Sequence, residues 1–355
     1  MSGHELIRLN TLSEMVSSIL GTGRSELVQI ARGQSPKTKL SSRIKKIKRW
    51  ILNEKTSYEN HYKPYALELL NRLSKQGELV FSIDGSVMGR GCMSLMFSVI
   101  YQGKALPIIW EVHKAKKGHL KEICHQSLLK ELSLIVPKNC RVIIVGDGEF
   151  DGCDFQEDIK KLGWFYVLRT GKNIEIEEEQ GELFKLKTIE VDQFGTLFLE
   201  EVRFTKKQYG PVNILIWHDK EHEDPLYLVT NLDSGMEIKS FYKKRFKIEP
   251  FFRDQKSKGF HIHRSGLGCP QRLSKLLIAT CLAYVICIMS GVKAMKSKLY
   301  GLAAREDGNF LSLFQLGLRF IEVLVDLRQW RAFSWTRDLP LVKEDLYYEQ
   351  NLVPF

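Results

Sequence analysis

Four polar residues stand at fixed spacing in the segment from Tyr242 to Lys256, which reads YKKRFKIEPFFRDQK. Tyr242, Arg245, Glu249 and Lys256 follow the pattern Y-x2-R-x3-E-x6-K. On a helix of roughly 100° per residue, these offsets place all four side chains within about 60° of one another. A carboxylate beside a phenol, a guanidinium and an ammonium group is suited to holding a metal next to phosphates. The same pattern is also compatible with the solvated face of a basic helix.

Pro250 lies inside this segment and affects its expected geometry. Proline lacks an amide hydrogen, and it disfavours helical dihedral angles at the preceding residue, Glu249. We therefore expect a single helix kinked at Pro250, with Lys256 rotated relative to the other three residues.

Two further acidic residues follow apolar segments. Asp84 ends LVFSID (79–84), Asp147 ends RVIIVGD (141–147), and a glycine follows each. Asp is disfavoured in strands, although Asp-Gly is also ordinary turn chemistry. On adjacent strands, both carboxylates would lie at the carboxyl edge of the sheet, where sites of open α/β sheets are found. With Glu249 they would supply three hard oxygen ligands for Mg²⁺ or Mn²⁺, and two such ions can support an in-line phosphoryl transfer.

The elements that must position these acids alternate between apolar strands and helices. Gln102-Gly103 predicts a tight turn between the second and third strands. The expected strands are 79–84, 92–101, 104–111, 141–147 and 164–169, and the expected helices are about 117–134 and 151–162. Wholly apolar strands are typical of a sheet covered by helices on both faces, so the order β-β-β-α-β-α-β predicts a mixed α/β core. Glu149 and Asp151, beside Asp147, are compatible with groups that support the site from outside, but a solvated loop is the favoured interpretation.

Residues 1–75 are predicted to be helical, with Thr11 to Glu14 resembling a capping box at a helix start. The segment 41–51 predicts a basic amphipathic helix with three isoleucines on one face. Such a helix can lie on DNA phosphates or on a membrane surface, or simply solubilise the protein. The candidate DNA-binding residues on it are Arg43, Lys45, Lys46, Lys48 and Arg49.

The rest of the chain divides into segments with different hydrophobic patterns. Residues 172–225 contain short alternating segments and predict a β-rich insertion, after which 226–231 resumes a buried strand. The apolar run 276–292 favours a buried core helix over a membrane span, and apolar helix continues to about Trp330 before a polar tail. The expected domains are a helical basic domain (1–75), a catalytic core (76–171 and 226–292), the insertion (172–225) and a C-terminal helical region with its tail (293–355).

Composition limits the class of partner. The 355 residues are 44% hydrophobic and 27% charged, as in an ordinary globular protein. A formal net charge of +11 and a pI near 9.2 indicate a polyanionic partner such as nucleic acid, or an anionic membrane. The seven cysteines form no CxxC pair, and the first residues lack the apolar run of an export signal, which together favour the cytoplasm.

The chain resembles the DDE transposases of bacterial insertion sequences, in the branch whose signature is Y-R-E-K. Asp84 matches the first acid, Asp147 the second within the DxxFD-like context DGEFD, and Glu249 the third. The other three signature residues stand at the full spacing, and the resemblance covers roughly residues 78–290. It implies a ribonuclease-H-like catalytic core, with a β-rich insertion between the second Asp and the Glu.

The resemblance also implies a mechanism. Asp84, Asp147 and Glu249 would hold two Mg²⁺ (or Mn²⁺) ions, water would nick the element's end, and the freed 3′-OH would attack target DNA. Arg245 and Lys256 would bind phosphates near the cut, and Tyr242 would position the same strand. The implied partners are the terminal inverted repeats and the target DNA, bound by a homodimer on paired ends in the bacterial cytoplasm, associated with the nucleoid.

One departure concerns members that pass through a DNA hairpin, in which a flipped base stacks on a Trp of the strand before the signature helix. The segment 226–231 has no Trp, which leaves Tyr227 or Trp217 as substitutes. Two alternatives to a transposase stay open. One is a metal-dependent nuclease or resolvase with the same core and the same residues, and the other is a non-catalytic DNA-binding descendant.

Overall fold

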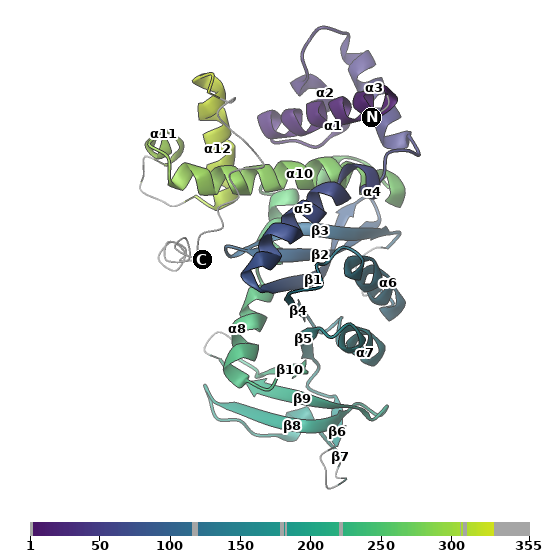
Figure 1. Cartoon of the computed structure of the whole chain (residues 1–355), viewed down its shortest axis with the longest axis vertical. Helices are drawn as coiled ribbons and strands as arrows, with labels where there is room; N and C mark the ends of the chain where they lie inside the picture. The colour runs from purple at the N-terminus through teal and green to yellow at the C-terminus, as the bar shows by residue number, and fades with distance from the viewer. Residues whose placement is uncertain are drawn as a thin grey trace.

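A large mixed β-sheet is the central element of the computed structural model (Figure 1). The structure describes residues 3–115, 120–177, 181, 183–219, 223–305, 307 and 311–329. Within them ten strands form one sheet in the order β3-β2-β1-β4-β5-β10-β9-β8-β6-β7. The strands are β1 Glu78–Gly89, β2 Cys92–Tyr101, β3 Lys104–His113, β4 Arg141–Gly146, β5 Phe165–Thr170, β6 Glu175–Glu177, β7 Leu183–Lys185, β8 Thr196–Phe204, β9 Tyr209–Trp217 and β10 Leu226–Thr230.

The first five strands have the topology expected from the sequence. β1, β2 and β3 form an antiparallel meander, and β4 and β5 run parallel to β1. Together with the flanking helices, this order is the ribonuclease-H-like mixed α/β core, so the predicted fold class is confirmed. β10 pairs antiparallel with β5 and β9 antiparallel with β10, so the strands β6 to β9 of segment 172–225 extend the same sheet.

Helices cover the two faces of the sheet unequally (Figure 1). α6 (Glu122–Ser133) and α7 (Cys153–Lys161) lie on one face, where side chains such as Phe81 and Ile144 join the main core. α8 (Gly235–Arg245) lies on the other face. The strand residues that pack with α8 are Val80, Ile143, Val145, Val167, Leu215, Trp217, Leu226 and Leu228. Because strand side chains alternate between faces, any residue an even number of positions from these also faces α8.

The N-terminal helices are α1 Gly3–Thr22, α2 Leu27–Gly33, α3 Leu40–Leu52, α4 Tyr58–His61 and α5 Lys63–Leu73. Of these helices, α1, α3 and α4 pack on α10, α2 packs on α1 and α3, and α5 packs on β3 (Figure 1). The predicted helix start at Thr11 is wrong, because Thr11 lies inside α1 and its hydroxyl donates to the Ile7 carbonyl at 2.8 Å. A threonine that bonds the carbonyl four residues earlier is tolerated within a helix, so T-x-x-E does not mark a start here.

The C-terminal part consists of α10 (Pro270–Met295), α11 (Tyr300–Ala303) and α12 (Leu313–Asp326). Among the described residues, α10 is the one helix long and apolar enough to cross a membrane, with a mean hydropathy of 2.0 over its most apolar window. In this fold 83% of that window is buried, as expected for a core helix. The tail predicted beyond Trp330 lies outside the described residues, and the division into domains stays a prediction.

Candidate active site

Asp84 and Asp147 lie side by side on neighbouring parallel strands. Ser82 of β1 pairs with Val145 of β4, so Asp84 and Asp147, two residues further along, are level with each other. Neighbouring strands are about 4.8 Å apart. Alternation from Val145 places both carboxylates on the face covered by α8.

The expectation that Asp84 ends its strand is wrong. β1 continues to Gly89 because residues 85–89 keep pairing with β2, and Asp84 itself lies opposite Met96. Asp147, in contrast, directly follows β4, and its Oδ1 accepts the Glu149 amide hydrogen bond at 3.0 Å. Since β4 stops at Gly146 while β1 runs on, the two acids still meet at the carboxyl edge of β4.

Asp84 is a buried carboxylate in a negative environment. Its side chain is 16% exposed, and burial, followed by the charge of Asp147, raises its pKa to about 7. Glu249 acts in the same direction. Arg245 and the Gly85 amide, which donates to Asp84 Oδ1 at 2.7 Å, oppose the rise. The site is therefore short of positive charge when all three acids are ionised.

The signature residues come from two helices rather than from one kinked helix. α8 ends at Arg245, and α9 runs Ile248–Gln255, so the interruption falls at Phe246 and Lys247. The predicted kink at Pro250 is wrong. Pro250 lies in the first turn of α9, where the missing amide hydrogen would have no intrahelical acceptor.

Arg245 connects Asp84 of the sheet to Glu249 of α9. Its side chain is buried, its Nη2 donates to Glu249 Oε1 at 2.8 Å, and its Nη1 lies 3.9 Å from Asp84 Oδ2. The Ser82 hydroxyl donates to the Arg245 carbonyl at 3.3 Å and fixes the end of α8 on β1. Glu249 is 55% exposed, so its carboxylate is free to turn away from Arg245 towards a ligand.

Tyr242 and Lys256 complete the cluster. Lys256 Nζ donates to Ser86 Oγ at 2.8 Å; burial lowers the pKa of Lys256, while Asp84 raises it. Tyr242 is fully buried, and burial raises its pKa, so it is a neutral phenol at physiological pH. Asp147 is among the charges that affect Tyr242. The structure thus brings all four signature residues together with both strand acids.

The donor set fits a hard divalent cation by its chemistry. Burial and the charges of Asp147 and Glu249 raise the pKa of Asp84, and a cation would relieve the repulsion between these carboxylates. Within the described part of the chain, no three His, Cys, Asp or Glu side chains already converge with metal-ligand geometry. Glu249 is bound to Arg245 instead, so a shared metal requires it to exchange that partner for the cation.

The segment after Asp147 is held in place, so its interpretation as a solvated loop is wrong. Glu149 Oε1 accepts the Leu120 amide hydrogen bond at 2.7 Å and lies 3.5 Å from His125 Nε2. Asp151 Oδ2 accepts a hydrogen bond from the Thr170 hydroxyl at 2.6 Å, and burial raises its pKa. These bonds tie the loop to the start of α6 and to the end of β5.

Arg169 of β5 was not identified from the sequence. It is exposed, lies on the α8 face by alternation from Val167, and is close enough to Tyr242 to lower that residue's pKa. It makes no ion pair with any described residue. The sequence signal for Arg169 is an arginine at the end of an otherwise apolar strand, which follows the strand that leads to Asp147.

The N-terminal basic residues divide into two groups on α3. Lys45, Lys48 and Arg49 are exposed. Arg43 donates to the Gln34 carbonyl at 2.6 Å, and Lys46 pairs with Glu14 at 2.7 Å, so both already have partners within the N-terminal region. Figure 1 shows α3 at the opposite end of the molecule from the insertion strands β8 and β9. The structure does not bring these five residues to the acids.

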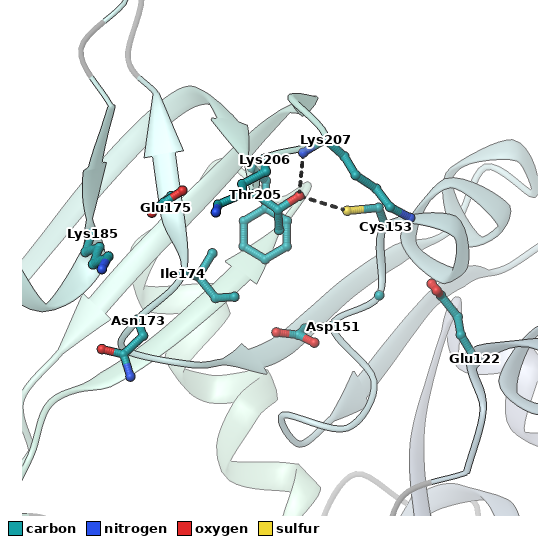
Figure 2. A pocket seen from close by; sticks show the side chains of 12 residues that line it. Glu122, Asp151, Cys153, Asn173, Ile174, Glu175, Lys185, Thr205, Lys206 and Lys207 are labelled. Carbon is teal, nitrogen blue, oxygen red and sulfur yellow. Dashed lines mark hydrogen bonds between the residues drawn. The ribbon is translucent and has the colours of Figure 1, made fainter.

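A cavity of about 550 Å³ lies between the start of α7 and the insertion (Figure 2). Figure 2 shows Glu122 and Asp151 on one side and Lys185 and Lys206 on the other. The wall also includes Cys153, whose Sγ lies 3.5 Å from Thr205 Oγ1. None of the predicted catalytic or signature residues lines this cavity.

The two aromatic residues considered for base stacking are buried. Tyr227 is 7% exposed and Trp217 is 8% exposed. The ring of Trp217 is approached by the ammonium groups of Lys239 and Lys243. A base could stack on Trp217 only after displacing these lysines.

The sequence matches the family model described as "Transposase DDE domain" over residues 75–286. This match spans more than half of the chain, so the protein belongs to that family and is an enzyme of the transposase type, with a DDE catalytic domain. No curated protein matches the chain significantly. Among solved structures, a cryo-electron microscopy structure of a piggyBac transposase synaptic complex with hairpin DNA is similar, with 11% identity, a TM-score of 0.46, and coverage of 100% of this chain and 77% of that one.

Proposed function

We propose that this protein is the transposase of a bacterial insertion sequence, in the Y-R-E-K branch. It would cut at the ends of its element and join the freed 3′-OH to target DNA. The observation that supports this proposal best is the assembly around Asp84, in which Asp147 lies level on the next strand and Arg245 lies between Asp84 and Glu249. Tyr242 and Lys256 of the same signature surround this group.

In this proposal Asp84, Asp147 and Glu249 hold two Mg²⁺ (or Mn²⁺) ions. Such ions, when bound, activate the attacking oxygen and stabilise the leaving oxygen of an in-line displacement. Arg245 is then released by Glu249 and presents its guanidinium group to a phosphate oxygen, which suits its planar fork of donors. The raised pKa of Asp84 implies that the metal-free site gains protons near neutral pH and releases them on metal binding.

The remaining signature residues would position DNA. Lys256 is held by Ser86 beside Asp84 and supplies a point charge for a phosphate next to the cut. The neutral phenol of Tyr242 donates a hydrogen bond to the same strand. The exposed cations of α3, Lys45, Lys48 and Arg49, would contact the terminal repeat, and a homodimer would bring two ends together in the cytoplasm.

The test combines cutting and joining in one assay. A labelled duplex with a candidate element end and a supercoiled target are incubated with Mg²⁺ or with a chelator. We expect metal-dependent nicking and a joined product in the wild type and in Glu131→Gln, an exposed control on α6. Asp84→Asn and Glu249→Gln should each lose at least about 100-fold in rate, since the metal-binding carboxylates supply several kcal/mol of transition-state stabilisation.

The same assay separates the alternatives. Cleavage without joining would indicate a metal-dependent nuclease or resolvase and refute strand transfer. DNA binding without cleavage, unchanged in Asp84→Asn and Glu249→Gln, would indicate a non-catalytic descendant and refute the catalytic role of the acids.

A further inference from the structure

Two lysines of α8 are held over a single tryptophan ring. Lys239 Nζ lies 5.5 Å and Lys243 Nζ 5.3 Å from the ring centroid of Trp217, the last residue of β9. The Lys239 ammonium also donates to the Thr196 hydroxyl at the start of β8. Cations within about 6 Å of an indole are attracted by its ring quadrupole, so the two charges have defined positions.

These cations lack the acidic partners that other charges on the same helix have. On the other side of α8, Glu237 forms an ion pair with Arg141, and Lys244 lies 3.9 Å from the carboxylate of Glu78. In the part of the chain that the structure describes, no carboxylate lies within ion-pairing distance of Lys239 or Lys243. Burial and the neighbouring charge of Lys243 lower the pKa of Lys239. Two like charges held together in this way favour an anionic ligand.

The lysine pair lies on the same sheet edge as the catalytic acids. β9 runs parallel to β4 and β5, because it is antiparallel to β10 and β10 is antiparallel to β5. Trp217 therefore ends its strand at the edge where Asp147 ends β4, and both face α8. Arg169 lies between them on β5. Three strand spacings separate β4 from β9, or about 14 Å, which equals about four base-pair steps of DNA.

We propose that Arg169, Lys239 and Lys243 form a phosphate-binding track that guides DNA from the catalytic acids across the sheet edge onto the insertion strands. The proposal rests on the proposed function, that the protein acts on DNA, and it adds a path and residues outside the signature. The cations succeed one another from Asp147 to Trp217, and none is neutralised by an ion pair among the described residues. Contacts of this kind set the position of DNA and do not read its sequence.

The experiment measures how DNA affinity depends on salt. The variant Lys239→Gln/Lys243→Gln is compared with Lys130→Gln/Lys160→Gln, which removes two exposed lysines from α6 and α7 on the opposite face. The probe is a labelled duplex with a candidate element end, in chelator so that it is not cut. Each lost phosphate contact reduces the slope of log K against log salt by about 0.9, so two contacts reduce it by about 1.8.

Between 50 and 200 mM salt, wild-type affinity should thus fall about 12 times more than that of the Lys239→Gln/Lys243→Gln variant. Arg169→Gln should reduce the slope by about 0.9. The Lys130→Gln/Lys160→Gln control should keep the wild-type slope. Circular dichroism and thermal melting check that every variant is folded.

Two outcomes would overturn the track. If the Lys239→Gln/Lys243→Gln variant keeps the wild-type slope while the wild type binds and cuts DNA, these lysines only pack on Trp217, and the proposed function stands. If both double variants reduce the slope equally, the effect is one of net charge and no track exists. A wild type that neither binds nor cuts DNA would instead refute the proposed function, and the track with it.

Discussion

Replacing Asp84 by asparagine should stabilise the metal-free protein at high pH. The side chain is 16% exposed, and its pKa is raised from 3.8 to about 7 by burial and by Asp147. A carboxyl group with a raised pKa in the folded state binds its proton more tightly there than in the unfolded chain. Stability is therefore greatest below pH about 4 and is lost as the pH rises towards about 7. The amide introduced by Asp84→Asn would resemble the neutral acid and would not lose this stability.

The size of the effect follows from the shift. A rise of about three pKa units corresponds to about 4 kcal/mol over the whole range, at 1.36 kcal/mol per unit. The interval from pH 5 to about pH 7 covers about two of these units. From pH 5 to pH 8, the free energy of unfolding of Asp84→Asn relative to the wild type should therefore increase by about 3 kcal/mol. For a chain of this size, that corresponds to a difference in melting temperature of about 5 °C.

The assay is thermal melting at pH 5 and pH 8, in chelator and in Mg²⁺. Asp254→Asn is the matched control, because Asp254 of α9 is also buried with a pKa raised to about 7. Both variants should gain stability with rising pH relative to the wild type. Mg²⁺ should stabilise the wild type and Asp254→Asn, by about 2.7 kcal/mol at 100 times the dissociation constant, and should leave Asp84→Asn almost unchanged.

Two results would refute this reasoning. If the gain in stability of Asp84→Asn over the wild type is the same at pH 5 and pH 8, the pKa of Asp84 is not raised in the folded protein. If Mg²⁺ stabilises Asp84→Asn as much as the wild type, the metal does not bind at Asp84.

Three further predictions concern packing and positioning. In Gly317→Ala the new Cβ would lie 1.8 Å from the Cys287 carbonyl oxygen, so α10 and α12 must separate. Denaturant unfolding should show a free energy of unfolding lowered by about 3 kcal/mol. An unchanged unfolding midpoint would contradict this contact. Trp50→Ala removes a buried ring that packs edge-on against His61 and should lower the unfolding free energy by about 3–5 kcal/mol, whereas a small change would indicate a surface role for Trp50. Tyr242→Phe should keep the melting temperature and reduce nicking about tenfold, the value of one hydrogen bond, and full activity would exclude a role for its hydroxyl.

The core and its acids were predictable because their signals are local. Apolar β-branched runs identify β1 to β5, and their alternation with helices predicts a mixed α/β core. An acid that follows an apolar strand, as Asp147 does, is visible without knowledge of the partner strand. The signature residues were found by spacing alone, and they meet around Asp84 although α8 and α9 are separate helices.

The errors arose where tertiary contacts outweighed local preference. β1 continues past Asp84 because its pairing with β2 compensates the poor strand propensity of Asp and Gly. The helix break precedes Pro250 because a proline is accommodated in a first turn. The partners of Asp151 and the position of Arg169 depend on which strand lies beside β4, and no single segment of sequence contains that information.

The most direct test of the account locates the metal itself. Fe²⁺ is bound in place of Mg²⁺, ascorbate and hydrogen peroxide are added, and the radicals formed at the metal cut the nearby backbone. The account predicts cuts near residues 84, 147 and 249 together, suppressed by excess Mg²⁺ and lost in Asp84→Asn. Cuts elsewhere, or the same three cuts in Asp84→Asn, would contradict the claim that these carboxylates share one metal site.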